Sequence, residues 1–282
     1  MDITKIGIIG SHGMVGSQVR KWFEEKQKEG KCSLFLSDKG KKIGSIEEVN
    51  KADIIFVAVP TPYKENDEYD LSILEEVISQ IKDGKVVVIK STVNPGTTDK
   101  FQEKYPGKIF MFNPEFLTEL TAWEDFIRPD MQVLGIAESG YEYASAIIQI
   151  LPRAHVMRIV SLIDAEWVKK IRNAYYSMKV IFFNQIFDIV SKTSPADYET
   201  IRSIIVEDPR IGNSHSFIFH KGYRGFSGPC LPKDTYSLIE FAKRVEASSE
   251  LLEVVKKINK ELTEGKDFSY GTLGANVISN RT

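Results

Sequence analysis

A short stretch, Gly225 to Asp234 (GFSGPCLPKD), combines the residue types of a nucleophilic site. Cys230 is followed three and four residues later by Lys233 and Asp234. A thiol near a cation can lose its proton near neutral pH and then acts as a nucleophile. The glycines and prolines of this stretch predict a shaped loop rather than a helix or strand. The alternative is a small buried cysteine that only packs inside a Gly/Pro turn.

A second candidate site lies near the N-terminus, where a glycine-rich turn follows a short apolar run. Residues 6–9 predict a buried strand, Gly10-Ser-His-Gly13-Met-Val-Gly16 follows, and residues 17–26 are in helical register. Strand, glycine turn and helix together are typical of a dinucleotide site, because the pyrophosphate lies on the helix N-terminus. The spacing GxxGxxG is one residue longer than the usual GxGxxG, and glycine turns between strands and helices are common.

Asp38 ends a second expected strand, which includes residues 34–36, and lies 22 residues (38 − 16) after Gly16. A carboxylate about 20 residues beyond such a turn accepts a hydrogen bond from the ribose 2′-hydroxyl. An acidic residue at this position favours NAD over NADP. The alternative is a turn residue that precedes Lys39 and Gly40.

Further apolar runs alternate with helical patterns through the first half of the chain. We expect strands at residues 53–59, 85–90, 109–112 and 131–136 (the last of this domain), and helices at 71–81 and 141–151. This alternation predicts βαβ units and a parallel sheet, whose ligands lie beyond the carboxyl ends of the strands. Thr61 and Thr92 follow two of these strands and are therefore candidate site residues, although each could simply end its strand.

Two pairs of polar residues are each spaced four apart, as neighbours on one helical face would be. Glu115 and Glu119 form the first pair, for which the alternative is a solvated helix start, and the residues alone favour that alternative. Lys169 and Asn173 form the second pair. For these the alternative is a surface lysine and an ordinary polar contact.

The second half of the chain predicts a helical domain. Residues 161–193 contain no glycine or proline and predict one helix of about 30 residues, longer than most. Ser194-Pro195 is expected to end it and to cap the next helix, which runs to about Val206, with Pro195 at the first helical position. Helices at 235–245 and 249–262 follow. We expect an NAD-binding domain at 1–160, a helical dimerisation and catalytic domain at 161–265, and a polar tail at 266–282.

Composition excludes several classes of protein. The 282 residues are 42% hydrophobic and 27% charged with a net charge of −2, which gives no reason to expect a nucleic-acid or membrane partner. Two cysteines, Cys32 and Cys230, make no disulfide framework, and no Cys/His spacing predicts a metal site. We expect no signal peptide, because residues 1–10 lack a basic segment followed by a long apolar one, and no run approaches 18 apolar residues. These features predict a cytoplasmic protein in a reducing environment.

With these residues placed, the chain resembles the UDP-glucose/GDP-mannose dehydrogenase family. The resemblance covers roughly residues 5–262, and its pieces occur in the family's order. They are AVPTP (58–62), KSTVNPGT (90–97), FNPEFLTE (112–119), RPD (128–130), the segment 169–173, DPRIGN (208–213) and GPCLPKD (228–234). Together these motifs are highly specific, although each alone is not. The implied fold is α/β, a Rossmann-like doubly wound parallel sheet followed by an all-α domain with a long central helix.

The resemblance implies an oxidoreductase that converts the 6-hydroxyl of a nucleotide-sugar to a carboxylate with two NAD per turnover. Cys230 would trap the intermediate aldehyde as a thiohemiacetal, which a second hydride transfer turns into a thioester. Lys169 and Asp234 would handle the developing alkoxide and the water, and Asn173 would orient the substrate. Glu115 would be the acid/base for hydrolysis, with Thr92 placing a water.

The resemblance also implies the binding residues, the substrate and the assembly. UDP-glucose is the favoured substrate, within polysaccharide biosynthesis, and Arg210 would reach the neighbouring subunit's substrate in a homodimer. The substrate-binding residues would be Phe116, Leu117, Lys169, Asn173 and Arg210. The NAD-binding residues would be Gly10, Gly13, Met14, Val15, Gly16, Asp38, Val59, Thr61, Thr92, Glu119 and Lys233.

The sequence departs from the family's pattern in several places. The glycine turn carries one extra residue, the segment after Asp38 is short enough that a helical piece is expected to be missing, and Ser227 stands where glycine is usual. The stretch from Arg210 to Cys230 looks a few residues longer, and a third, nucleotide-covering domain is expected to be absent. Two other readings stay open: a single-step dehydrogenase of a smaller alcohol or hydroxy acid, and a catalytically idle derivative of the family.

Overall fold

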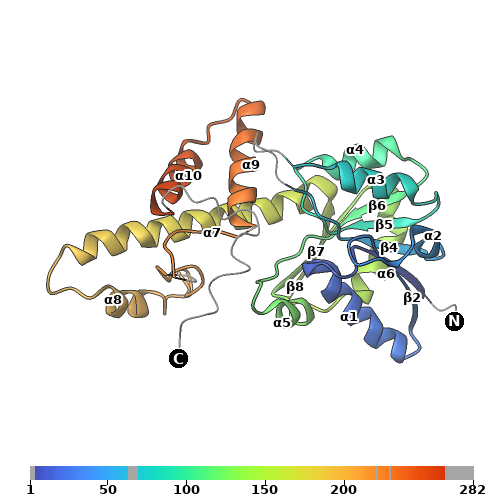
Figure 1. Cartoon of the computed structure of the whole chain (residues 1–282), viewed down its shortest axis with the longest axis horizontal. Coiled ribbons are helices and arrows are strands. Elements are labelled where there is room, and N and C mark those ends of the chain that lie inside the picture. The colour runs from blue at the N-terminus through green and yellow to red at the C-terminus, as the bar shows by residue number, and fades with distance from the viewer. Residues whose placement is uncertain (1–3, 63–68, 220–221, 229, 264–282) are drawn as a thin grey trace. The chain divides into compact units, whose positions relative to one another are not determined.

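The computed structural model describes residues 4–62, 69–219, 222–228 and 230–263. Their fold has two compact units, the first ending at Lys169 and the second beginning at Lys170 (Figure 1). The domain limits expected from the sequence remain predictions. The tail expected at 266–282 lies outside the described residues.

The first unit is built on one eight-stranded sheet in the order β3-β2-β1-β4-β5-β6-β7-β8. From β2 to β6 neighbouring strands run parallel, while β3 is antiparallel to β2, β7 is antiparallel to β6, and β8 is parallel to β7. The strands are β1 (Thr4–Ile9), β2 (Cys32–Asp38), β3 (Ile43–Gly44), β4 (Ile54–Val57), β5 (Val86–Ile89), β6 (Ile109–Phe112), β7 (Met131–Ile136) and β8 (Val156–Ser161).

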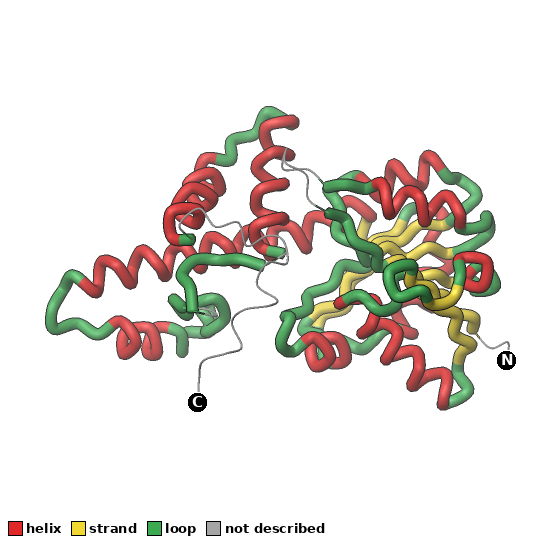
Figure 2. The backbone as a smooth tube through the Cα atoms, viewed as in Figure 1, coloured by secondary structure: helices red, strands yellow, loops and turns green. Residues whose placement is uncertain are grey.

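Helices cover both faces of this sheet (Figure 2). One face packs on α2, α3 and α4 through residues such as Val49, Ile78 and Phe101, and the other packs on α1, α5 and α6 through Phe23 and Phe126. Successive residues of each buried strand point to opposite faces, which is why these strands are continuously apolar. The helices are α1 (Met14–Lys28), α2 (Ile46–Val49), α3 (Ser72–Gln80), α4 (Thr97–Lys104), α5 (Ala122–Ile127), the 3₁₀ turn η1 (Glu138–Gly140) and α6 (Tyr141–Ile150).

This architecture confirms the Rossmann-like fold, because β1 lies between β2 and β4 and the chain winds to both sides of it. The expectation that Met131–Ile136 is the last strand is wrong, since β8 follows it at the edge of the sheet. Most residues of β8 are exposed, so it lacks the apolar run of a buried strand. The segment after Asp38 contains the two-residue β3 and the four-residue α2; the loss of a helical piece relative to the family stays a prediction.

In its described residues, the second unit consists of helices and the loops that join them. It contains most of α7 (Leu162–Ser191), which begins in the first unit, together with α8 (Tyr198–Ile205), α9 (Leu231–Arg244) and α10 (Glu250–Leu262). Two small cores pack on α7, one around Ile181 and Phe226 and the other around Phe183. The long central helix predicted from the sequence is confirmed, with 30 residues. In the described ranges, no helix has the length and hydropathy needed to cross a bilayer.

Two helix starts differ from the sequence predictions. Asp197, not Ser194, caps α8, because its carboxylate accepts a hydrogen bond from Thr200 N at 2.7 Å, and Pro195 precedes the helix. The stretch Gly225 to Asp234 is not all loop, since α9 begins at Leu231. Pro232 fits this first turn because a proline there has no N–H that the helix would need to pair.

Candidate active site

The glycine turn after β1 brings three backbone segments into close contact. Gly10 has a φ of 78°, and a Cβ there would lie 2.4 Å from Ala58 O, in the loop after β4. A Cβ on Gly16, in the first turn of α1, would lie 2.0 Å from Gly10 O. Gly13 precedes α1, and no side chain caps its N-terminus. This turn suits a dinucleotide. Its glycines have no side chains to keep a pyrophosphate away from the backbone, and the amides at the N-terminus of α1 can donate hydrogen bonds to it.

Asp38 ties the end of β2 to this turn. Its Oδ2 accepts a hydrogen bond from His12 N at 2.9 Å, and its Oδ1 accepts one from Lys41 N at 3.0 Å. The Asp38 carboxylate therefore stabilises the turn that follows β2 and also contacts the glycine turn after β1. Each oxygen of a carboxylate can accept a second hydrogen bond, so a ribose hydroxyl can still bind there.

The loops after β4 and β5 are joined by two short hydrogen bonds. Thr61 Oγ1 donates to Thr92 O at 2.7 Å, and Ser91 Oγ donates to Val59 O at 2.7 Å. The side chain of Val59 packs in the core, so only its main chain is directed to this loop pair. Thr61 thus fixes the main chain of Thr92 and leaves the Thr92 hydroxyl for other partners.

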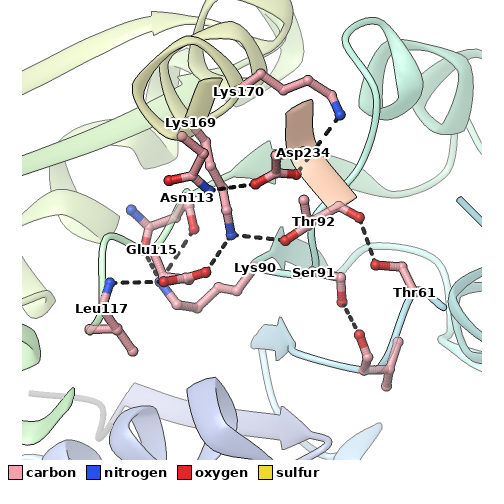
Figure 3. Close-up of polar contacts among 12 residues, drawn as sticks. Thr61, Lys90, Ser91, Thr92, Asn113, Glu115, Leu117, Lys169, Lys170 and Asp234 are labelled. Carbon is pink, nitrogen blue, oxygen red and sulfur yellow. Dashed lines mark hydrogen bonds and ion pairs between the residues drawn. The ribbon is translucent and has the colours of Figure 1, made fainter. Parts of the chain in front are cut away.

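Lys169 of α7 gathers the polar residues at the carboxyl end of the sheet (Figure 3). Its ammonium donates to Thr92 Oγ1 at 2.8 Å and forms a short ion pair with Glu115 Oε1. The Lys169 and Glu115 side chains are only 4% and 8% exposed. Leu117 N donates to the other carboxylate oxygen, Oε2, at 2.9 Å. The first unit therefore brings three of the predicted site residues together: Thr92, Glu115 and Lys169.

The electrostatics of Glu115 favour its charged form. Burial alone would raise the pKa of Glu115, but the positive charge and hydrogen bond of Lys169, the Leu117 amide and the charge of Lys90 together hold it below its usual value. Glu115 is therefore ionised at neutral pH. A carboxylate in this state can accept a proton.

A second polar cluster lies between α7 and α9 in the second unit. Asn173 Nδ2 donates to Asp234 Oδ2 at 2.5 Å. Lys170 is fully buried, donates to Ser237 Oγ at 2.5 Å, and lies 3.9 Å from Asp234 Oδ1 (Figure 3). Cys230 is half-buried and immediately precedes α9, where its carbonyl accepts a hydrogen bond from Asp234 N at 2.9 Å.

The other predicted residues lie in varied surroundings. Glu119 is exposed in a turn, and residues 113–118 form no helix, so Glu115 and Glu119 do not share a helical face. The rigid Pro114 and the buried bonds of Asn113 keep this segment out of a helix. The remaining predicted residues are placed as follows: Met14 is exposed, Val15, Phe116, Leu117 and Lys233 are partly buried, and Arg210 is exposed in an ion pair with Asp208.

Three buried polar residues of these two clusters were not predicted from the sequence. In the first unit Lys90 Nζ donates to Asn113 Oδ1, and in the second unit Lys170 pairs with Asp234. Lys90 opens the KSTVNPGT motif and Lys170 follows Lys169, so the motifs themselves contained the signal.

Glu166, one turn before Lys170 on α7, was also missed. It is 1% exposed and accepts hydrogen bonds from Gly96 N at 2.5 Å, Thr98 N at 2.8 Å and Thr98 Oγ1 at 2.6 Å, so it caps α4. Burial raises the pKa of Glu166 to about 7, although these donors act to lower it. Glu166 therefore anchors the start of α7 to the loop that follows Thr92.

Comparisons with known proteins identify the family. The model of the UDP-glucose/GDP-mannose dehydrogenase family's NAD binding domain matches residues 33–151, and that of its central domain matches residues 163–261. The chain is 34% identical over 226 residues to the UDP-glucose 6-dehydrogenase of Rickettsia bellii, covering 76% of this chain and 51% of that protein. It is 35% identical over 222 residues to UDP-glucose 6-dehydrogenase YwqF of Bacillus subtilis, covering 74% and 49%.

Solved structures agree on the fold. A UDP-glucose dehydrogenase from Pyrobaculum islandicum superposes with a TM-score of 0.78 at 24% identity, covering 92% of this chain and 68% of that one. A UDP-D-ManNAc dehydrogenase from Pyrococcus horikoshii gives 0.75 at 19% identity, covering 93% and 69%. The chain spans about half the length of the curated relatives it matches. The chain belongs to the UDP-glucose/GDP-mannose dehydrogenase family and carries that family's NAD-binding and central domains.

Proposed function

We propose that this chain catalyses the NAD-dependent oxidation of a nucleotide-sugar 6-hydroxyl to a carboxylate, with UDP-glucose as the favoured substrate. The observation that carries the proposal is the buried contact of Lys169 with both Thr92 and Glu115. It provides a cation, a hydroxyl and an ionised carboxylate at the carboxyl end of a dinucleotide-type sheet. The curated relatives named above are UDP-glucose 6-dehydrogenases, which supports this choice of substrate.

Each protein residue has a definite task in this reaction. NAD, when bound, accepts the hydride in each of the two oxidations. Cys230 attacks the aldehyde carbon as a thiolate, a form that a helix N-terminus favours, and holds the substrate as a thiohemiacetal and then as a thioester. Lys169 and Asn173, one helical turn apart on α7, stabilise the negative oxygen that develops on the substrate. Water then breaks the thioester, giving the carboxylate and the free Cys230 thiolate.

We assign the activation of this water to Glu115, with Thr92 positioning the water. Glu115→Gln keeps the shape of the side chain but removes its capacity to accept a proton. We expect hydrolysis to slow on the order of 10²–10⁴-fold, so that the Cys230 thioester accumulates. Intact-mass spectrometry after mixing the variant with NAD and UDP-glucose would detect it. Glu124→Gln, a change on an exposed carboxylate of the nearby α5, is the matched control. If Glu115→Gln turns over like the parent, Glu115 is not the base.

The position of Asp38 leads us to expect that NAD binds more tightly than NADP. Its carboxylate would repel a 2′-phosphate, and we expect a preference of about tenfold or more, which corresponds to about 1.4 kcal/mol. Isothermal titration calorimetry of the whole chain with each cofactor measures this preference. Asp38→Asn should narrow it, whereas equal or tighter binding of NADP by the parent would leave Asp38 as a turn residue only.

We further propose a cytoplasmic homodimer that forms through α7. Large apolar side chains remain exposed along this helix, namely Ile171, Tyr175, Phe182 and Ile189. Such a stripe is typical of a helix that packs against a second copy. Arg210, whose side chain is 88% exposed, would then reach the substrate of the neighbouring subunit. We expect light scattering at micromolar concentration to give twice the mass of one chain. A monomer at that concentration would contradict both the homodimer and the role of Arg210 across subunits.

The yield of NADH per molecule of UDP-glucose tests the proposed reaction. A full oxidation to the acid produces two molecules of NADH, because each step transfers one hydride. One NADH would instead indicate a single-step dehydrogenase. The chain would be a catalytically idle derivative if no NADH forms from UDP-glucose or from any other UDP- or GDP-sugar. In that case these sugars should also leave its melting temperature unchanged.

A further inference from the structure

Lys90, directly after β5, places a buried ammonium at the carboxyl end of the sheet. The residue is 3% exposed. Its Nζ lies 2.5 Å from Asn113 Oδ1 and 3.3 Å from Asn113 O, and 5.9 Å from the centre of the Phe126 ring. Burying an unpaired ammonium is strongly unfavourable, so a lysine in this position needs a compensating negative charge as well as these neutral oxygens.

Asn113 holds this ammonium in one place. Asn113 is fully buried, and its amide Nδ2 donates to Gln132 Oε1 at 2.9 Å and to Val133 O at 2.7 Å. Its main-chain N donates to Ile89 O at 2.9 Å. Every polar group of Asn113 is therefore engaged, which fixes the Lys90 ammonium and the start of the segment that leads to Glu115.

Glu115 supplies the negative charge that Lys90 needs. Lys90 directly follows β5, and its ammonium contacts Asn113, which lies two residues before Glu115 in the loop after β6 (Figure 3). In this position the charge of Glu115 raises the pKa of Lys90 and the charge of Lys169 lowers it. Burial is the largest effect and brings the pKa of Lys90 to about 7. Two buried cations, Lys169 from α7 and Lys90 after β5, thus stabilise the negative charge of the Glu115 carboxylate. This carboxylate also accepts a hydrogen bond from the Leu117 amide.

We propose that Lys90 is a positioning residue that, clamped by Asn113, keeps the Glu115 carboxylate ionised as the base for thioester hydrolysis. The inference rests on the proposed function for the identity of that step. It assigns to Lys90 no contact with the substrate. Because Lys169 also bonds Thr92, Lys90 supplies a positive charge that stays with Glu115 when Lys169 is engaged with a substrate oxygen.

The acid titration of Glu115 tests this proposal directly. In full-length protein with ¹³C-labelled glutamate, the Glu115 carboxyl signal is assigned by its loss in Glu115→Gln. Lys90→Met removes the cation at similar volume, and we expect the pKa of Glu115 to rise, although by less than it would on loss of Lys169. Glu115 titrates in acid, where Lys90 is charged in the parent, so the comparison captures the full effect. Lys90→Arg keeps the charge and should restore most of the parent titration.

Lys108→Met is the matched control for loss of a buried lysine. Lys108 is 5% exposed, precedes β6 at its amino end, and pairs with Asp83 at 3.1 Å, so its loss should leave the Glu115 titration unchanged. Equal shifts in Lys90→Met and Lys108→Met, or no shift in Lys90→Met, would overturn the proposal. If Lys90→Met does not fold, Lys90→Gln, which also lacks the charge but can still donate a hydrogen bond to Asn113 Oδ1, provides the same comparison.

Activity measurements separate this proposal from the proposed function. If the parent forms acid, Lys90→Met should move the acid limb of the hydrolysis rate to higher pH, because Glu115 must then lose its proton at higher pH to act as a base. A parent that forms no NADH overturns the proposed function, while the carboxyl titration still reports whether Lys90 controls Glu115. If Lys90→Met raises the pKa of Glu115 as expected but leaves the pH dependence of the hydrolysis rate unchanged, Lys90 acts on Glu115 but Glu115 is not the base.

Discussion

Cys230→Ser should abolish net formation of the sugar acid while leaving the fold and NAD binding intact. The serine hydroxyl can still add to the aldehyde, but it is a weaker nucleophile without a base of its own. Any ester that forms is hydrolysed far more slowly than a thioester. We expect acid formation to fall on the order of 10³-fold or more, as for the loss of other catalytic nucleophiles.

The measurement combines NADH yield with intact mass after mixing with NAD and UDP-glucose. A covalent adduct or a product stalled at the aldehyde is expected for Cys230→Ser, whereas Glu115→Gln should stall later, at the thioester. Cys32→Ala is the matched control, because Cys32 is the other free thiol and is buried against Phe23, with Sγ 3.5 Å from Phe23 O. If Cys230→Ser turns over like the parent, Cys230 only packs beside α9, and a single-step oxidation becomes the better description.

The sheet was predictable where burial makes the sequence continuously apolar. The interior strands β4, β5 and β6 are covered on both faces, so runs such as VVVI identify them without ambiguity. The edge strand β8 includes Arg158 among exposed residues and carries no such signal. The two-residue strand β3 exists only through its pairing with the end of β2, which no local pattern reveals.

The contacts of the candidate site residues were predictable only in part. Lys169 and Asn173 share a helical face because of their spacing alone, whereas the partners of both depend on long-range packing. Lys169 meets Glu115 across 54 residues of sequence, and Asn173 meets Asp234 across 61. Glu166, bonded to Gly96 across 70 residues, resembles an ordinary acidic residue in the first turns of a helix until the fold is known.

Gly16→Ala should destabilise the first unit and weaken NAD binding together, because both depend on the same close approach of backbone. The new Cβ would lie 2.0 Å from Gly10 O and 3.2 Å from Ser11 Cα, and neither backbone atom can move away without opening the turn between β1 and α1. Such overpacking costs about 1–3 kcal/mol or more. For a unit of this size we expect the melting temperature to fall by roughly 2–4 °C per kcal/mol.

Gly13→Ala separates this steric effect from a general loss of flexibility in the turn. A Cβ on Gly13 would lie 3.5 Å from Gly10 O, an ordinary contact, and its φ of −70° suits alanine. Thermal unfolding should therefore distinguish the two variants, with Gly13→Ala melting like the parent. Calorimetry should show an NAD affinity at least about tenfold lower for Gly16→Ala, since about 1.4 kcal/mol of lost binding energy suffices. Parent-like melting and NAD binding in Gly16→Ala would mean that the turn relaxes freely, and the cofactor would then have to bind without the close contact between Gly10 and α1.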